Sequence, residues 1–357
     1  MITSIDIKSF KSFNNEKIPF KPLTLLSGLN NCGKSSLIQA MRMHINASKG
    51  GDVYLNGYGR FKELKSKLSK PELPIEIILD YNNGNVEVLR IHEQGEIEKP
   101  TFHPNVIYIS ADRLGPQAYL PLNIGSEVEI GVHGEFVIDF IQKLSLCIIP
   151  DTLSHPNSEG KTLEYELRGW LTEIAPGVNV NLHQNTKTDT SNAEFDGYRP
   201  KNVGFGLSYT LPIIAAVLGA VADRPSAGWS EDERWGEEWS AAKEQRGCLL
   251  ILENPEAHLH PQGQTAMGKL IALAANHGVQ VVIETHSDHL MDGIRIAAKR
   301  GLVNHEKIIF HYLSKDSTGE TKIISPSIDA NGKLDKWPDG FFDQTAINKA
   351  LLAKKER

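Results

Sequence analysis

The sequence predicts an α/β protein with a parallel sheet and a second, mostly helical part. Short apolar runs alternate with segments of helical spacing over 248–313, as in consecutive β–α–β units. A glycine-rich segment at 28–35 also lies between an apolar run and a segment with helical spacing. We expect one α/β lobe from residues 1–133 together with 247–357, and a mostly helical lobe from 134–246.

The N-terminal third of the chain is predicted to form mainly strands. Apolar and polar residues alternate over the first twenty positions, which predicts edge strands, and 22–28 predicts a buried strand. Residues 35–47 have helical spacing. Two alternating runs within 74–92 flank the turn Asn-Asn-Gly-Asn and predict a hairpin, and 105–110 predicts another buried strand.

Two amphipathic helices are predicted within the helical lobe, over 134–145 and 163–174. An acidic insertion follows at about 223–246. Aromatic residues are favoured at interfaces, so a docking surface is one interpretation of this insertion, and folding back onto its own lobe is the other. The insertion contains three of the five tryptophans, Trp229, Trp235 and Trp239.

Composition and charge narrow the class of protein. The chain has 38 Lys and Arg against 44 Asp and Glu, so it has no overall basic surface for nucleic acid, although a local one stays possible. The cysteines Cys32, Cys147 and Cys248 show neither zinc spacing nor a disulfide framework. No signal-peptide run is present, and the longest apolar stretch, 211–222, is short for a membrane span. We therefore expect a cytoplasmic protein without a membrane partner.

The glycine-rich segment matches the phosphate-loop pattern G-x-x-x-x-G-K-[ST]. Gly28 and Gly33 let the backbone turn tightly, so that its N–H groups surround phosphates beside the positive end of a helix. Lys34 is expected to reach the β- and γ-phosphates of ATP, and the Ser35 hydroxyl to bind Mg²⁺. The strand–loop–helix context favours this function over a chance match. The predicted ATP-binding residues are Gly28, Asn30, Asn31, Gly33, Lys34, Ser35 and Ser36.

A second motif supplies an acid at the end of a strand. The apolar run after Cys248 ends at Glu253, which is the form of a Walker B strand. A carboxylate at this end of a strand beside a phosphate loop can hold Mg²⁺, directly or through water. Glu253 is therefore predicted as a metal ligand together with Ser35.

With these motifs the chain resembles the ABC-type ATPases of the OLD and RecF/SMC kind. The resemblance rests on ENPEAHLHP (253–261) and VVIETHSDHL (281–290), and it covers nearly the full length. The chain is most similar to a subgroup with the element WPDGFFDQ (337–344), many of whose relatives belong to bacterial anti-phage systems, including ATPase subunits of Septu and some retrons. The implied fold is a P-loop NTPase, an ABC-ATPase head with a mixed sheet lobe and a helical lobe.

The resemblance also implies roles around the predicted Walker B strand. His286 would be the switch histidine that contacts the γ-phosphate; a histidine that caps the next helix is the alternative. Asn254 stands where ABC ATPases carry the catalytic acid, and an amide cannot accept a proton at neutral pH, which predicts slow hydrolysis. Glu256 is the alternative base. Residues 257–260 would form the D-loop, and zinc binding by its histidines lacks further ligands at set spacing.

A degenerate signature motif is expected in 202–218, where glycines and a serine stand immediately before an apolar helix. By resemblance, Ser208 would bind the γ-phosphate of ATP held by the other subunit, with Gly204 and Gly206 allowing close approach. An ordinary helix cap is the alternative. A complete site would then need two chains, which predicts a homodimer or higher homo-oligomer around ATP.

These expectations lead to an ATPase that regulates, senses for or scaffolds a separate effector, such as a nuclease or another toxin, in anti-phage defence. A RecF/SMC-like DNA-repair or chromosome-handling ATPase is the alternative, and DNA or RNA binding stays open. An ABC transporter subunit would need a clearer signature and Q-loop, for which Gln117 is one candidate. Arg113 is open between nucleotide or partner binding and a structural ion pair. No intrinsic nuclease is expected, because the roughly seventy residues after His286 are too few for a Toprim domain.

Overall fold

The computed structural model describes residues 1–203, 205–225 and 231–354. The chain divides into two compact units. The first unit consists of Met1–His103, Ile308–Asp329 and Lys333–Arg357. The second unit consists of Pro104–Lys307 and Ala330–Gly332. These limits are not those of the expected lobes, 1–133 with 247–357 and 134–246, and that functional division stays a prediction.

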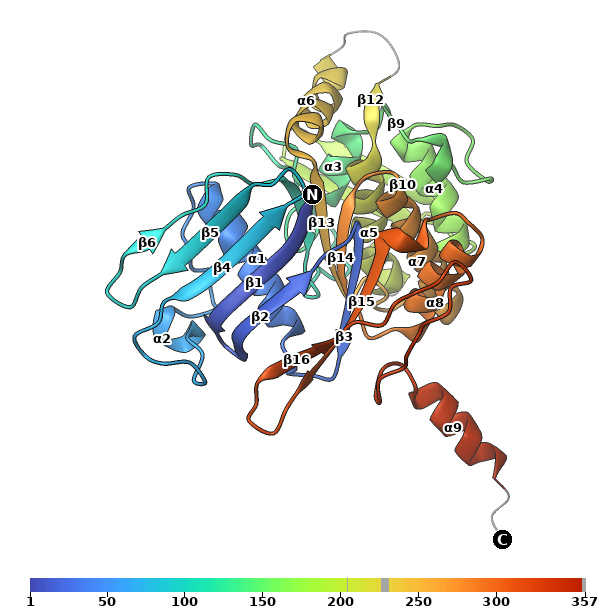
Figure 1. Cartoon of the computed structure of the whole chain (residues 1–357). Helices are drawn as coiled ribbons and strands as arrows, with labels where there is room; N and C mark the ends of the chain where they lie inside the picture. The colour runs from blue at the N-terminus through green and yellow to red at the C-terminus, as the bar shows by residue number, and fades with distance from the viewer. Residues whose placement is uncertain (204, 226–230, 355–357) are drawn as a thin grey trace. The chain divides into compact units, whose positions relative to one another are not determined.

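The first unit contains a five-stranded antiparallel sheet (Figure 1). In spatial order its strands are β2 (Phe13–Pro19), β1 (Ile2–Phe10), β4 (Ile75–Tyr81), β5 (Val86–Ile91) and β6 (Ile97–Glu98). Burial alternates residue by residue along β4, as expected of a strand with one face in the core. The hairpin predicted in 74–92 is confirmed by the pairing of β4 with β5. The edge-strand prediction is correct for β2 but wrong for β1, because β1 pairs with a neighbour on each side.

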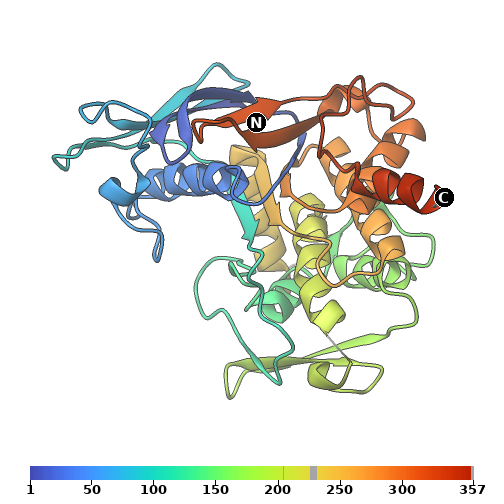
Figure 2. The same cartoon turned by 90° about the horizontal axis from the view of Figure 1, so that it is seen from below.

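A second set of strands in the first unit is mixed. It consists of β3 (Leu23–Gly28), β15 (Ile308–Lys315) and β16 (Thr321–Ile324), with β15 parallel to β3 and antiparallel to β16. The helices of this unit are α1 (Lys34–Ser48), α2 (Phe61–Leu64) and α9 (Gln344–Ala353). The predicted helix 35–47 is confirmed by α1, which packs under the antiparallel sheet (Figure 2).

Three parallel strands form the centre of the second unit. Their order is β14 (Gln280–Glu284), β13 (Cys248–Glu253) and β7 (Asn105–Ile109). Helix α7 (Pro261–Asn276) follows β13, and α8 (Asp288–Lys299) follows β14. The two helices pack closely through glycines, because a Cβ at Gly268 would lie only 2.2 Å from Leu290 O. The predicted β–α–β rhythm is confirmed for these elements.

The remainder of the second unit is mostly helical. Its helices are α3 (Val137–Lys143), α4 (Leu163–Ile174), α5 (Phe205–Val221) and α6 (Glu231–Arg246), with short 3₁₀ turns η1 (Asp151–Leu153), η2 (Pro200–Asn202) and η3 (His305–Lys307). Its small antiparallel pairings join β10 (Val180–Asn185), β11 (Thr190–Phe195) and β8 (Leu120–Pro121), and β9 (Cys147–Ile148) with β12 (Asp223–Pro225). Helices α3 and α4 confirm the two predicted amphipathic helices. Over the described ranges, no helix is long and apolar enough to cross a bilayer.

The tryptophans of the acidic insertion pack against their own unit where they are described. Trp239 on α6 is buried and donates its Nε1–H to Gly219 O at 2.7 Å. The Lys143 ammonium lies 4.4 Å from the centre of the Trp235 ring. These contacts favour the interpretation that the insertion folds back onto α3 and α5. Trp229 lies outside the described residues.

Candidate functional site

The phosphate loop connects β3 to α1 in the first unit. Gly28 and Gly33 have φ values of +139° and +113°, which only glycine adopts readily. A Cβ at Gly28 would lie 2.2 Å from Leu313 O, and a Cβ at Gly33 would lie 2.7 Å from Thr321 Oγ1. Backbone conformation and lack of space therefore both require glycine at these positions.

The Lys34 ammonium is held across this loop. Its Nζ donates to Gly28 O at 2.9 Å and to Leu29 O at 3.0 Å, and only 4% of the residue is exposed. Helix α1 starts with no side-chain cap, so the N–H groups of its first turn point toward the loop. A cation and a helix N-terminus thus converge where the sequence predicts phosphate binding.

The other predicted loop residues differ in exposure. Asn30, Asn31 and Ser35 are exposed, and Ser36 is half-buried. Their roles toward ATP stay predictions. Thr321 on β16 also belongs to this site, because its buried Oγ1 donates to Cys32 O at 2.9 Å and so supports the loop from behind. No local pattern marks Thr321, because this contact joins residues 289 positions apart.

Glu253 ends β13 in the second unit, as the Walker B pattern predicts. Tyr108 on the neighbouring strand β7 donates its hydroxyl to Glu253 Oε1 at 2.9 Å and so fixes the carboxylate. A carboxylate is a ligand that suits Mg²⁺, which keeps several waters and binds substrate phosphates, and the metal-binding roles of Glu253 and Ser35 stay predictions. Within the residues that the structure describes, no three His, Cys, Asp or Glu side chains gather into a larger metal site.

Asn254 follows Glu253 in an unusual backbone conformation. Its φ is +44°, a region that asparagine tolerates better than most residues. Its N–H donates to Glu284 O at 2.8 Å, which ties the end of β13 to the end of β14. The side-chain Oδ1 is buried and has no hydrogen-bond partner among the described residues. This acceptor is suited to orienting a water molecule.

Glu256 has the features of a general base. It is 9% exposed, and its Oε1 accepts the His286 backbone N–H at 2.9 Å. Its Oε2 is buried without a hydrogen-bond partner among the described residues. Burial raises the pKa of Glu256, opposed by hydrogen bonds with backbone N–H groups, that of His286 first, by a hydrogen bond with the Thr285 side chain and by the positive charge of Arg113. A carboxylate with one fixed oxygen, one available oxygen and a raised pKa is well placed to accept a proton.

The predicted switch follows β14. His286 is exposed, and its backbone N–H contacts Glu256, so the switch and the candidate base adjoin. The capping alternative for His286 is wrong, because Ser287 caps α8 by accepting the Leu290 N–H at 2.9 Å. Contact between His286 and a γ-phosphate stays a prediction.

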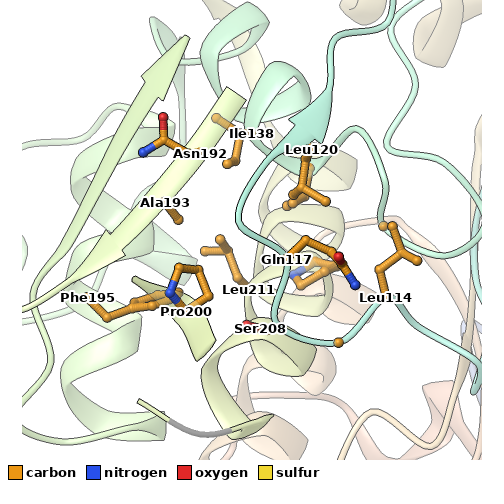
Figure 3. Close-up of a pocket in the computed structure, with 14 residues that line it drawn as sticks. Leu114, Gln117, Leu120, Ile138, Asn192, Ala193, Phe195, Pro200, Ser208 and Leu211 are labelled. Carbon is orange, nitrogen blue, oxygen red and sulfur yellow. The ribbon is translucent and has the colours of Figure 1, made fainter. Parts of the chain in front are cut away.

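Ser208 lies elsewhere than the sequence suggests. Helix α5 begins at Phe205, so Ser208 is inside the helix and does not stand immediately before it. It is half-buried and lines a narrow cavity with Gln117 and Leu211 (Figure 3). Gly204 lies outside the described residues. The binding role of Ser208 stays a prediction.

The start of α5 packs against the expected D-loop. The Phe205 ring stacks on His258 with 5.9 Å between ring centres, and the Tyr209 ring lies 4.5 Å from His258. A Cβ at Gly206 would lie 3.0 Å from His258 O, so this glycine lets α5 approach the backbone of residue 258. The expected close approach of Gly206 to the ATP of another subunit stays a prediction. Phe205 remains 57% exposed. The first turn of α5 and the D-loop therefore form one surface of the second unit.

Arg113 is buried behind the end of β13. Its guanidinium donates to the main-chain carbonyls of Ser110, Glu253 and Asn254, at 3.0, 2.7 and 2.7 Å. Burial lowers the pKa of Arg113 to about 10, which leaves it charged at neutral pH. These hydrogen bonds support a structural role for Arg113. The acceptors are main-chain carbonyls, whereas the sequence-based alternative was an ion pair with a carboxylate.

Comparison with known proteins agrees with these motifs. Residues 1–119 and 148–291 match the family model described as AAA ATPase domain, and residues 303–352 match one described as protein of unknown function (DUF3696). An OLD nuclease of Thermus scotoductus is 21% identical in an alignment that covers 99% of this chain and 70% of that protein.

Two solved structures show the same fold. One is an SMC head bound to the C-winged helix domain of ScpA, with a TM-score of 0.54 and 15% identity over 92% of this chain and 98% of that one. The other is an Smc head with an extended coiled coil, bound to the C-terminal domain of ScpA derived from Pyrococcus furiosus, with a TM-score of 0.51 and 12% identity over 99% of both chains. The predicted P-loop NTPase fold of the ABC-ATPase head type is confirmed. Since the ATPase model matches most of its length, the chain belongs to the AAA ATPase domain family.

Proposed function

We propose that the chain binds ATP and Mg²⁺ between two copies of itself, hydrolyses the ATP slowly, and thereby regulates a separate effector in anti-phage defence. The proposed binding of ATP is supported mainly by the preformed phosphate loop. There Lys34 Nζ is held 2.9 Å from Gly28 O by a backbone that only glycine can adopt. ATP binding would replace these carbonyl contacts by contacts with phosphate oxygens.

The metal would be held by Ser35 and Glu253, together with phosphate oxygens and water. Bound Mg²⁺ neutralises charge on the phosphoryl group that is transferred. The Tyr108 hydroxyl keeps one Glu253 oxygen in place, which orients the carboxylate before the metal arrives. The donor set matches the preference of Mg²⁺ for few protein ligands.

Hydrolysis would use Glu256 as the proton acceptor, with Asn254 holding the attacking water. The unpartnered Glu256 Oε2 and Asn254 Oδ1 are acceptors on the same short turn. An amide orients water but cannot take its proton. Asn254, at the position of the usual catalytic acid, can therefore only orient the attacking water. The base is two residues further along than in ABC ATPases, which favours slow turnover and a long-lived ATP-bound state.

The second copy would contribute the start of its α5 and its D-loop. The positive end of a helix favours a γ-phosphate, and Gly206 and Phe205 leave this end accessible. Because Ser208 faces a cavity of its own unit, the exposed Phe205 at the start of α5 is a better probe of pairing than Ser208.

We expect Phe205→Glu to abolish ATP-induced pairing while each chain still binds ATP. The new carboxylate would stand beside the γ-phosphate of the other copy and repel it. Light scattering with and without ATP–Mg²⁺ measures the pairing, and titration with a fluorescent ATP analogue measures the binding. Tyr165→Glu is the matched control, because Tyr165 is a 45% exposed aromatic on α4. Pairing that survives Phe205→Glu would contradict this placement of α5.

A separate effector is supported by the C-terminal helix α9. Its side chains Ile347, Leu351 and Leu352 are exposed, and apolar side chains spaced along one helix are a common means of binding a partner. The defence role rests on the family resemblance. The alternative, a RecF/SMC-like ATPase acting on DNA, predicts that duplex DNA stimulates hydrolysis; stimulation by DNA without any effector would favour it.

We also expect no metal-dependent DNA cleavage by the purified chain, although a relative is an OLD nuclease. Two acidic residues that follow His286 in the sequence already accept hydrogen bonds from the backbone. Asp316 Oδ1 accepts the Thr318 N–H, and Asp335 Oδ1 accepts the Ser327 N–H. Plasmid nicking in Mg²⁺ and in Mn²⁺ measures this activity. Cleavage that is lost in Asp316→Ala or Asp335→Ala, but not in Asp151→Ala on η1, would contradict the prediction.

A further inference from the structure

We infer that Arg113 is a positioning residue for ATP hydrolysis, which holds the catalytic turn in shape and connects it to the start of α5. The catalytic turn is defined here as residues 253–256. The inference rests on the proposed function, in which this turn supplies the base. Arg113 itself is 2% exposed and hydrogen-bonds to protein carbonyls, so its action on the reaction is through the turn.

The guanidinium bonds to two consecutive carbonyls of this turn. Nη1 donates to Glu253 O and Nη2 donates to Asn254 O, both at 2.7 Å. Two donors in a rigid planar fork fix the orientation of both carbonyl groups, and therefore of the side chains between them. Nη1 also donates to Ser110 O at 3.0 Å, which anchors the fork to the segment that follows β7.

Such an anchor is needed because the turn is conformationally unusual. Asn254 has φ at +44°, and the carbonyl oxygens of Glu253 and Asn254 both face the Arg113 guanidinium, so their negative ends lie close together. A buried cation between them stabilises this arrangement. The same positive charge acts on the Glu256 carboxylate, so Arg113 also stabilises the ionised form of this buried acid. Lysine would keep the charge but would lack the planar fork.

Ring contacts extend from Arg113 to the exposed surface. The Arg113 guanidinium carbon lies 5.4 Å from the centre of the Tyr209 ring on α5. Tyr209 contacts His258 of the D-loop, and His258 stacks on Phe205. The surface formed by the start of α5 and the D-loop, which we propose to face the other copy, is therefore joined to the catalytic turn of the same chain through Tyr209 and Arg113. All these residues lie within one unit. Pairing would tighten this chain of contacts and position the turn for hydrolysis.

The first test is Arg113→Lys, measured by two quantities. We expect the single-turnover rate of ATP hydrolysis to fall by about 100-fold, the loss typical of a small misplacement of reacting groups. The Kd for a fluorescent ATP analogue should stay within about threefold of the wild-type value. Arg168→Lys is the matched control, because Arg168 pairs with Glu164 on the surface of α4 in the same unit. It should change neither quantity.

The second test is Tyr209→Leu, which leaves the guanidinium–carbonyl bonds in place and removes the link to α5. We expect a loss of about tenfold in hydrolysis, with ATP affinity unchanged. If Arg113→Lys does not fold, this variant still tests the connection between Arg113 and α5. A wild-type rate in Tyr209→Leu would overturn the connection to α5.

Two results with Arg113→Lys would overturn the inference: a wild-type rate, or equal losses of binding and hydrolysis in a folded chain. Glu256→Gln is measured alongside, because it tests the proposed base independently. If Glu256→Gln keeps the wild-type rate while Arg113→Lys loses it, the assignment of the base fails and the positioning role stands. If only Glu256→Gln loses activity, the positioning role fails and the base stands.

Discussion

Replacing Glu256 by glutamine should lower the single-turnover rate of ATP hydrolysis by about 10²–10⁴-fold. That loss corresponds to roughly 3–5 kcal/mol of activation free energy. Glutamine matches the shape of the side chain but cannot accept a proton, and its amide can still face the His286 N–H with its oxygen. ATP binding should be retained, because the phosphate loop is unchanged. Rapid-quench measurement of ADP formation with enzyme in excess gives the rate.

Glu166→Gln is a suitable control, since Glu166 is a fully buried acid on α4 that accepts hydrogen bonds from Ser154 and His155. It should leave the rate unchanged. Asn254→Glu separates the two interpretations of slow turnover. If the amide is the deficit, this variant hydrolyses faster, despite the cost of about 1–2 kcal/mol of placing glutamate at a left-handed φ. Wild-type hydrolysis by Glu256→Gln would show that Glu256 is not the base.

Replacing Lys34 by alanine should weaken ATP binding by about 30- to 150-fold. Hydrogen bonds to charged groups contribute about 2–3 kcal/mol, and the ammonium is the only side-chain cation in the predicted phosphate-binding set. Calorimetric titration with ATP–Mg²⁺ measures the affinity. Because Lys34 also bonds to Gly28 O and Leu29 O, the melting temperature should be recorded to separate lost binding from a disordered loop.

The matching control is Lys49→Ala, which removes an exposed lysine from the other end of α1. Its affinity for ATP should equal that of the wild type. Unchanged ATP affinity in a folded Lys34→Ala chain would contradict the placement of the phosphates on this loop.

Features that depend on neighbouring residues were predictable from the sequence. The phosphate loop, the hairpin in 74–92 and the buried strand ending at Glu253 all follow from local spacing of glycine, apolar and polar residues. The match of Gly28 and Gly33 to positive φ follows from the same pattern. The fold class was therefore correct, because each part is specified by a stretch of ten to twenty residues.

Features that depend on contacts between distant residues were not predictable. The support of Cys32 by Thr321 and the bonds from Arg113 to Asn254 join positions 289 and 141 apart. The start of α5 also differs from the sequence-based prediction. Gly206 and Ser208 indicate a loop before the helix, but both residues lie inside α5, which begins at Phe205. Twelve consecutive residues, from Thr210 to Val221, are buried in the core, and this packing outweighs the local preference of glycine.

The most direct test of ATP-dependent pairing is the mass of Glu256→Gln in solution with ATP–Mg²⁺, measured by light scattering during gel filtration. This variant should bind ATP without consuming it and so accumulate the paired state. We expect a mass near twice the 39.5 kDa of one chain with ATP–Mg²⁺, and the mass of one chain without nucleotide. A single-chain mass at every protein concentration, with ATP shown to be bound, would contradict it.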